Sequence, residues 1–170
     1  MKNIILIISV FLSFNSFAQS PEEQLTKLGI VLPEVAPPVA SYVNVVRTGN
    51  LLFLAGKGPV KKDGEYIKGK LGKDLSVEEG AKAAELTATH HLAILKAYLG
   101  DLSKVKRIVK INGFVNSEAD FYEQPKVING ASNLMVQVFG EKGKHARTSI
   151  GVNTLPMNMA VEIEMIVEVE

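Results

Sequence analysis

Apolar and polar residues alternate most regularly over the last ten residues of the chain. Every second position from 161 to 169 is Val, Ile or Met, and the positions between them include Glu162 and Glu164. A period of two predicts a β-strand that buries one face. A shorter apolar run opens with Arg147, and Leu155-Pro156 between the two runs predicts a turn. The sequence therefore predicts two neighbouring strands that bring Arg147 close to the glutamates.

A helical period appears twice in the middle of the chain. Residues 76–100 place an apolar stripe on one side, with Ser76 opening a capping box and Gly100 following the last turn. A second helical segment is expected over residues 117–140. Pro125 is expected to break or restart it, because proline lacks the N–H that a helix interior needs.

Three further strands complete the predicted architecture, at residues 42–46, 51–55 and 107–115. The order strand, strand, helix, strand, helix, strand, strand is typical of an α+β fold, a two-layer mixed sheet with two helices on one face. The other face would be mostly apolar, which is unusual for a sheet that faces water, so we expect a second subunit to cover it. The residues expected on this face include Ile108, Phe114, Ile150, Val152 and Ile166.

The first 18 residues have the pattern of a secretory signal peptide. Lys2 precedes an apolar run over residues 4–14, and Ser16 and Ala18 occupy the −3 and −1 positions of a cleavage site. The run is shorter than the roughly 20 apolar residues that a membrane span requires. We therefore expect cleavage after Ala18 and a periplasmic or secreted protein that is not held in a membrane.

The rest of the chain divides into a short N-terminal segment and one domain. Residues 19–39 are expected to hold a short helix at 21–29 followed by a proline-rich linker, since three prolines fall within residues 31–40. Residues 40–170 are of the size of a single domain.

Composition and charge make several classes of protein poor matches. The chain has 19 Lys and Arg against 18 Asp and Glu, so its formal net charge is +1. Nucleic-acid-binding domains gain most of their affinity from an excess of cations, so we expect no nucleic-acid partner. The sequence contains no cysteine, no zinc-ligand spacing, no P-loop and no GxGxxG motif. It therefore offers no disulfide and no recognisable metal or nucleotide motif.

Two longer stretches carry a family resemblance. SYVNVVRTGNLLFLAGKGPV, at 41–60, and HARTSIGVNTLPMNMAVEIEMIVEV, at 145–169, are similar to the N-terminal pattern and the C-terminal signature of the RidA (YjgF) family of reactive-intermediate deaminases. The resemblance extends from about residue 40 to 170. EEQLTKLGIVLPEVAPP, which precedes it, is similar to the prelude of the branch labelled chorismate-mutase-like or endoribonuclease.

This resemblance implies both an assembly and a reaction. The family fold, chorismate-mutase-like, would form a homotrimer with inward-facing sheets and with active sites at the subunit interfaces. The reaction would be hydrolysis of small enamine or imine acids to keto acids and ammonia. It would use neither a cofactor nor a metal.

Arg147 and Glu162 are the candidate catalytic residues. Arg147 matches the family arginine that holds the substrate carboxylate, for which a planar guanidinium is suited because it can bind both oxygens. Its alternative role is a structural ion pair with Glu162 or Glu164. Glu162 matches the family glutamate, which would orient water and act as a general base. Its alternative is an exposed strand glutamate.

Four further residues are candidates for substrate binding. The resemblance implies that Tyr42 closes over the substrate, that Asn129 contributes an amide, and that Gly56 offers a backbone group. Their alternatives are a half-buried strand aromatic, a helix-surface amide and an ordinary turn glycine. Ser149 is a departure from the family pattern, since well-known members have a cysteine there.

One lysine and three histidines also need an interpretation. Lys57 replaces an uncharged polar residue of the family, and its cation either favours a more anionic substrate or points outward. His145 is a candidate for the pocket entrance because it lies two residues before Arg147. His90 and His91 are about 100° apart on a helix, so they cannot chelate one ion; one is expected to be packed and the other exposed.

The sequence leaves three functions open. The first is a RidA-like hydrolytic deaminase. The second is a small-carboxylate binding protein without chemistry, which export favours because the usual sources of enamines are cytoplasmic enzymes. The third is an endoribonuclease, against which the near-zero net charge and the lack of an aromatic stacking platform argue.

Overall fold

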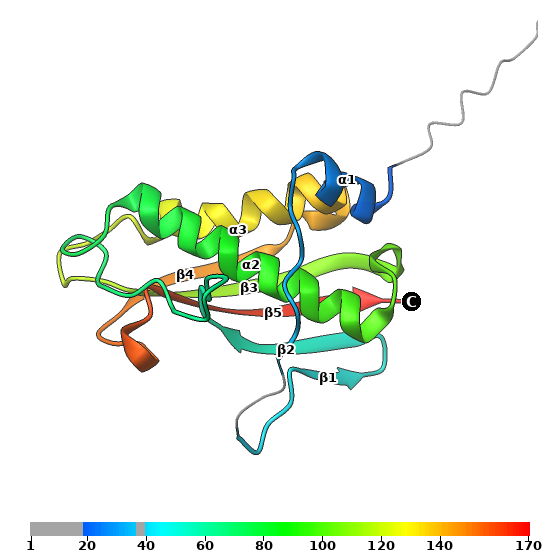
Figure 1. Ribbon diagram of the computed structural model, residues 1–170, viewed down its shortest axis with the longest axis horizontal. Helices are drawn as coiled ribbons and strands as arrows, with labels where there is room; N and C mark the ends of the chain where they lie inside the picture. Colours follow the sequence, from blue (N-terminus) through cyan, green and yellow to red (C-terminus); the bar gives the residue numbers. More distant parts are fainter. Residues whose placement is uncertain (1–18, 37–39) are drawn as a thin grey trace, which may run out of the picture.

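The computed structural model describes residues 19–36 and 40–170, and the signal peptide expected at 1–18 lies outside them. The described chain is a five-stranded sheet with helices packed on one of its faces (Figure 1). Three short 3₁₀ turns lie between these elements. The strands are β1 (Val45–Thr48), β2 (Leu51–Lys57), β3 (Val105–Asn116), β4 (Ala146–Val152) and β5 (Val161–Val169), and the helices are α1 (Pro21–Lys27), α2 (Val77–Leu99) and α3 (Gln124–Phe139).

The strand order is β1-β2-β5-β3-β4. β4 runs parallel to β3, and all other pairs are antiparallel. The prediction that the last two strands pair with each other is therefore wrong, because β3 lies between them. α3 connects β3 to β4 as a crossover, which delivers a parallel neighbour, and the chain then passes β3 to insert β5 into the middle of the sheet.

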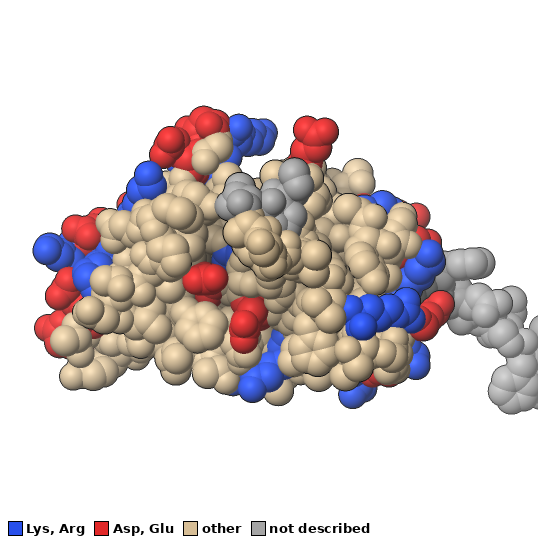
Figure 2. All heavy atoms as spheres, turned by 90° about the horizontal axis from the view of Figure 1, so that it is seen from below, with Lys and Arg blue, Asp and Glu red and all other residues tan. Residues whose placement is uncertain are grey.

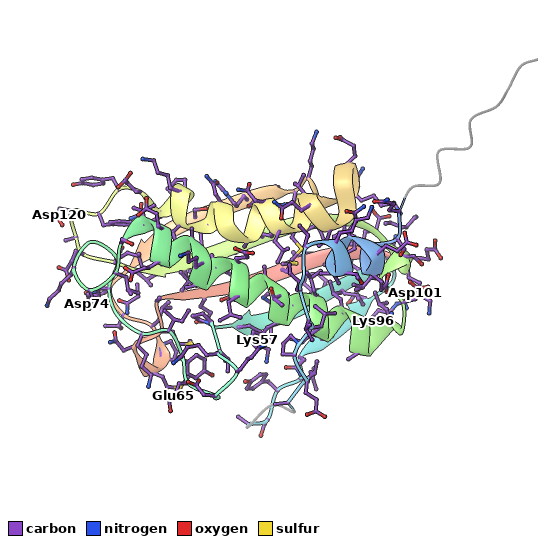
Figure 3. All side chains as sticks on the ribbon, turned by 45° about the horizontal axis from the view of Figure 1, so that its top comes forward. Lys57, Glu65, Asp74, Lys96, Asp101 and Asp120 are labelled. Carbon is purple, nitrogen blue, oxygen red and sulfur yellow. The ribbon has the colours of Figure 1, made fainter. Side chains whose placement is uncertain are left out.

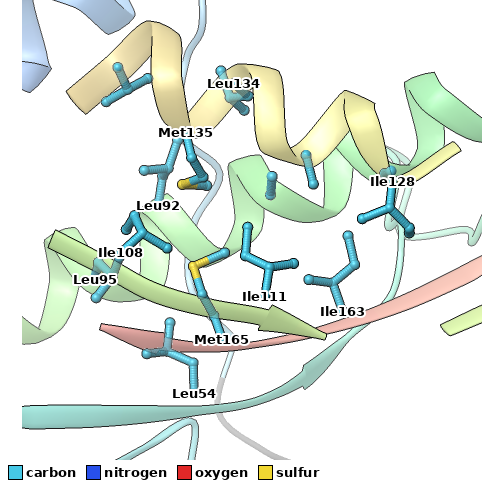
Figure 4. Packing of buried hydrophobic residues seen from close by; sticks show 14 of the residues in the cluster. Leu54, Leu92, Leu95, Ile108, Ile111, Ile128, Leu134, Met135, Ile163 and Met165 are labelled. Carbon is cyan, nitrogen blue, oxygen red and sulfur yellow. The ribbon is translucent and has the colours of Figure 1, made fainter. Parts of the chain in front are cut away.

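The hydrophobic core lies between the sheet and helices α2 and α3 (Figure 4). The two helices are in close contact at Gly130, where any Cβ atom would overlap the backbone carbonyl of Ala81. α1 packs on the same layer through the buried Leu25. Fully buried core side chains include Leu92, Leu95, Ile111, Leu134, Met135, Ile163 and Met165.

The two long helices begin and end for different reasons. α2 has the predicted capping box, in which Ser76 and Glu79 each bond the other's backbone N–H, and Gly100 ends it at φ 76°. α3 begins at Gln124 and not at 117, and Pro125 lies in its first turn, where no N–H is needed. The proline therefore starts this helix, and the helical prediction for residues 117–123 is wrong.

The sheet face away from α2 and α3 carries apolar residues alongside charged ones, and one residue predicted for it lies elsewhere. The pairing of β3 with β5 shifts register between Ile108 and Lys110, and this irregularity places Ile108 in the core. Phe114 and Ile150 are paired on the open face, and Ile150 is 44% exposed. The alternation of β5 is confirmed, since Glu162 and Glu164 lie on the open face.

An ion pair ties the N-terminal helix to the domain. Nζ of Lys96 on α2 lies 2.7 Å from Oε1 of Glu22, and the same oxygen accepts the backbone N–H of Leu102 at 2.9 Å. α1 is therefore part of the folded unit. Among the described helices, none is long and apolar enough to cross a membrane.

Candidate functional site

The structure divides the six predicted site residues into two groups of three. Tyr42, Gly56 and Glu162 line one cavity, whereas Asn129, Arg147 and Ser149 lie together where β4 passes under α3. β4 and β5 are separated by β3, and Arg147 points to the helix side while Glu162 lies on the open face. One chain therefore does not bring its own Arg147 and Glu162 into one site.

The cavity has a volume of about 380 Å³ and lies where β2 ends. Segments 34–36, 58–66 and 156–157 form its rim. In the view from below in Figure 2, most charged groups gather toward the ends of the molecule, and a few acidic groups lie near its middle. The side chains that carry polar or charged groups into this cavity include those of Glu34, Tyr42, Asn44, Lys57, His90 and Glu162.

Gly56 lies directly against the carboxylate of Glu162. A Cβ atom at this position would overlap Oε1 of Glu162. The pairing of β2 with β5 is irregular between Leu54 and Lys57, which brings the Gly56 backbone against that side chain. Gly56 is therefore more than an ordinary turn glycine.

Glu162 is half-buried. Burial, and secondarily the charge of Glu164, raise the pKa of its carboxyl group above the ordinary value of 4.5. A carboxylate with a raised pKa is a better proton acceptor near neutral pH. The environment of Glu162 therefore suits a general base and not an ordinary exposed strand glutamate.

Lys57 points into the cavity, so the alternative of an outward-pointing lysine is wrong (Figure 3). Its Nζ donates to Oδ1 of Asn44 at 2.6 Å and lies 6.0 Å from the centre of the Tyr42 ring. Burial lowers the pKa of this ammonium group. Tyr42 itself is 48% exposed at the rim, and its closing over a substrate stays a prediction.

Arg147 is held by uncharged oxygens of α3. One guanidinium nitrogen, Nη1, donates to Oδ1 of Asn129 at 2.8 Å and to Oγ of Ser132 at 3.1 Å. The ion pair considered with Glu162 or Glu164 is not formed within the described chain. The charge of Arg147 is therefore not neutralised by those glutamates. Asn129 contacts Arg147, and its role in substrate binding stays a prediction.

Ser149 lies on the same face as Arg147, and its register partner on β3 is Gly113. Its Oγ is buried and has no hydrogen-bond partner among the described residues. A buried polar atom without a partner is uncommon in a folded protein. This hydroxyl is consequently available to a bound molecule or to a water.

His90 and Ser132 have contacts that the sequence analysis missed. His90 is half-buried, lines the cavity and places Nε2 2.8 Å from the carbonyl oxygen of Val60. Ser132 contacts both Arg147 and His145. Its spacing of three from Asn129 on a helix was the available signal, since such residues share one face.

His91 is a core residue, as expected for one of the pair. It is fully buried, and its Nε2 donates to the carbonyl oxygen of Ile163 at 2.8 Å. Burial lowers its pKa to about 4, so the ring is neutral at pH 7. Within residues 19–36 and 40–170, no three His, Asp or Glu side chains converge as a metal site would require.

Comparison with known families identifies the fold. The family described as "YjgF/chorismate_mutase-like, putative endoribonuclease" matches residues 22–169. The chain belongs to this family. The resemblance seen in the sequence and the predicted α+β two-layer fold are thereby confirmed, and they agree with the five-stranded sheet described above.

Several known proteins are similar to this chain over most of their length. Protein TCP17 of Trypanosoma cruzi is 46% identical over 145 residues, which cover 85% of this chain and 91% of that protein. The 2-iminobutanoate/2-iminopropanoate deaminase of Dermatophagoides farinae is 29% identical, over 83% and 96% of the two chains. The crystal structure of Atu1372 from Agrobacterium tumefaciens, a protein of unknown function, is 46% identical with a TM-score of 0.82, over 88% and 94%.

Proposed function

We propose that the protein is a hydrolytic deaminase of small enamine or imine acids that releases a keto acid and ammonia. The observation that carries the proposal is the pair of complementary half-sites on each chain. The first half-site offers the guanidinium of Arg147 to a substrate carboxylate. The second offers the carboxylate of Glu162, whose pKa is raised, beside a cavity. A similar mite protein bears the name of such a deaminase.

The two half-sites require two copies of the chain. In this proposal Arg147 of one subunit faces the cavity of the next, and the open face of the sheet is buried in a homotrimer, as the resemblance implied. The exposed Ile150 and the half-buried Phe114 on that face support such an assembly, because patches of this kind are costly in water.

The chemistry then needs a single base. Arg147 binds the substrate carboxylate and fixes the imine carbon near Glu162. Glu162 takes a proton from water as the water oxygen bonds to the imine carbon, and the carbon–nitrogen double bond becomes single. The imine enters in its protonated form, so its nitrogen is an amine after this step. Glu162 then returns its proton to that amine, which leaves as ammonia, and Glu162 takes up the hydroxyl proton as the keto group forms.

The test is ammonia and keto-acid release from a freshly generated 2-imino acid. Arg147→Ala should lose most of the rate, and Arg107→Ala, an exposed arginine of β3, should not. Equal rates for the wild type and Arg147→Ala would overturn the assignment.

A mixing experiment tests the shared site directly. Arg147→Ala and Glu162→Gln should each be inactive alone. When the two are unfolded, mixed in equal amounts and refolded, about one quarter of the interfaces should pair an intact Arg147 with an intact Glu162 if partners are drawn at random. Recovery of about that fraction supports the shared site, whereas no recovery, despite mixed trimers being formed, contradicts it.

The second candidate function is a small-carboxylate binding protein without chemistry, and the environment of Ser149 favours it. Its unpartnered Oγ can hold a ligand without taking part in a reaction. Calorimetry with a panel of 2-keto acids separates the two functions, since tight binding without turnover of any imino acid supports the binder.

RNA is a poor ligand for this cavity, because Glu34 and Glu162 would repel phosphates.

Export is a separate proposal that rests on residues 1–18. If the leader is removed after Ala18, the mature chain begins at Gln19, one residue before the N-cap of α1. N-terminal sequencing of the protein recovered from the periplasm or medium tests this, and an intact Met1 there would contradict it.

A further inference from the structure

A chain of three hydrogen bonds runs away from the guanidinium of Arg147. Its Nη1 lies 3.1 Å from Oγ of Ser132, that Oγ lies 3.0 Å from Nε2 of His145, and Nδ1 of His145 lies 2.7 Å from the carbonyl oxygen of Gly143. These groups come from β4, from α3 and from the segment that leads into β4. The deaminase chemistry proposed above uses only the first of them.

The direction of each bond follows from what each group can do. A carbonyl oxygen only accepts, so Nδ1 of His145 carries the hydrogen and donates to Gly143. A guanidinium only donates, so Oγ of Ser132 accepts from Arg147. In a neutral imidazole Nε2 is then an acceptor, and it receives the hydroxyl hydrogen of Ser132. Burial, and secondarily the charge of Arg147, lower the pKa of His145 and favour this neutral form.

His145 therefore decides which way the hydroxyl of Ser132 points. A helical serine otherwise tends to donate to a backbone carbonyl one turn earlier, which would rotate its oxygen. With the hydrogen directed to His145, the lone pairs of Ser132 remain turned to Arg147. The segment that carries His145 is itself fixed, because Gly143 is buried against the backbone of Met135.

We propose that Ser132 and His145 are positioning residues that hold the guanidinium of Arg147 ready for a ligand carboxylate. Nη1 is fixed by Asn129 and Ser132, and neither Nε nor Nη2 has a protein acceptor among the described residues. Those two nitrogens form the edge that binds both oxygens of a carboxylate. The inference rests on the proposed function, because it gives Arg147 a small carboxylic acid as its ligand.

A serine bonded to a histidine is also the arrangement of hydrolytic nucleophiles. Here the Ser132 oxygen accepts a hydrogen bond from the cationic Arg147, which uses one of its two lone pairs and lowers its nucleophilicity, and this argues for positioning. A fluorophosphonate probe distinguishes the two roles. The proposal expects no covalent labelling of Ser132, and stoichiometric labelling that His145→Gln abolishes would overturn it.

The main test measures binding of 2-oxobutanoate and the steady-state constants for its imine. Ser132→Ala should weaken binding about tenfold, which is the usual scale for losing one hydrogen bond to a charged group. The loss should appear in KM with kcat nearly unchanged, and Ser132→Thr, which keeps the hydroxyl, should restore much of it. Ser103→Ala, an exposed serine of a 3₁₀ turn, is the matched control.

A double-mutant cycle shows whether Ser132 acts through Arg147. In the Arg147→Ala background, removing the Ser132 hydroxyl should cost nothing further in binding. Additive losses, or wild-type binding by Ser132→Ala, would overturn the proposal. If Ser132→Ala fails to fold, Ser132→Thr/His145→Gln is compared with Ser132→Thr alone and should again raise KM.

A measurement without ligand keeps this inference separate from the proposed function. Nitrogen-15 NMR of the arginine side chains should show hindered rotation of the Arg147 guanidinium in the wild type and faster rotation in His145→Gln. If the protein neither binds keto acids nor hydrolyses imines, the proposed function fails while this result still decides the positioning. A freely rotating guanidinium in the wild type would overturn the positioning itself.

Discussion

Gly56 leaves the space that the carboxylate of Glu162 occupies. We expect Gly56→Ala to displace this carboxylate and to reduce deamination strongly, because the new methyl group would overlap Oε1. Gly49→Ala is the informative comparison. Gly49 has φ 59° with open space around it, so alanine there should lower the free energy of unfolding by about 1 kcal/mol and leave activity intact. Enzyme assays and denaturant titrations of both variants check this, and a fully active Gly56→Ala would contradict the role given to Glu162.

The acidic limb of the pH–rate profile should belong to Glu162. Its carboxylate is the proposed base, so the rate should fall as the pH drops through its raised pKa. The charge of Glu164 contributes to that rise, and Glu164→Gln should therefore move the limb to lower pH. Glutamine keeps an oxygen for the amide of Asn112, which donates to Oε1 of Glu164 at 2.7 Å. Glu168→Gln, farther along the strand, should leave the acidic limb of the pH–rate profile in place. If Glu164→Gln does not move that limb, Glu162 is excluded as the group that titrates.

Lys57 should influence which substrate is preferred. Its half-buried ammonium group makes a hydrogen bond to a neutral amide and, within the described chain, no ion pair. We expect Lys57→Gln to reduce kcat/KM for a dicarboxylic imino acid about tenfold more than for 2-iminopropanoate, since an unpaired buried cation attracts a second carboxylate. Lys61→Gln, on the exposed loop, provides the comparison. An equal effect of Lys57→Gln on both substrates would remove Lys57 from specificity.

His91 should make stability depend on pH. The pKa of this ring is about 4 in the folded protein against an ordinary value of 6.5, so the unfolded chain binds more protons between these values. The free energy of unfolding should therefore fall as the pH drops from 6.5 to 4, by ~3 kcal/mol at most. His91→Gln can keep a donor to the carbonyl of Ile163 without titrating, and it should flatten this dependence. Urea unfolding at several pH values gives the answer, and an unchanged slope in the variant would mean that other groups cause it.

Local signals were enough to predict the parts of the fold that depend on neighbouring residues. Ser76 and Gly100 marked the ends of α2, and the strict alternation in β5 showed which face carries Glu162. Each of these signals is contained in one stretch of chain, so no knowledge of the partner element was needed.

The predictions that were wrong concern features of the fold that depend on two segments far apart in the sequence. Nothing near Arg147 indicates that β4 pairs with β3 and not with β5, because strand partners are chosen by the whole sheet. The irregularity that turns Ile108 inward is set in the same way by its pairing with β5. The contact of Ser132 with His145 joins a helix to a later strand approach, and neither residue predicts it alone.

The distance between the two long helices affects both half-sites of one chain. α3 carries Asn129 and Ser132, which hold Arg147, and α2 carries His90 in the cavity wall. Since only a hydrogen atom fits between Gly130 and the carbonyl of Ala81, this contact fixes the distance between the two helices. In a ring of identical subunits, a change in that distance would be repeated at every interface. A site built between subunits therefore tolerates less structural variation inside each subunit than a site contained in one chain.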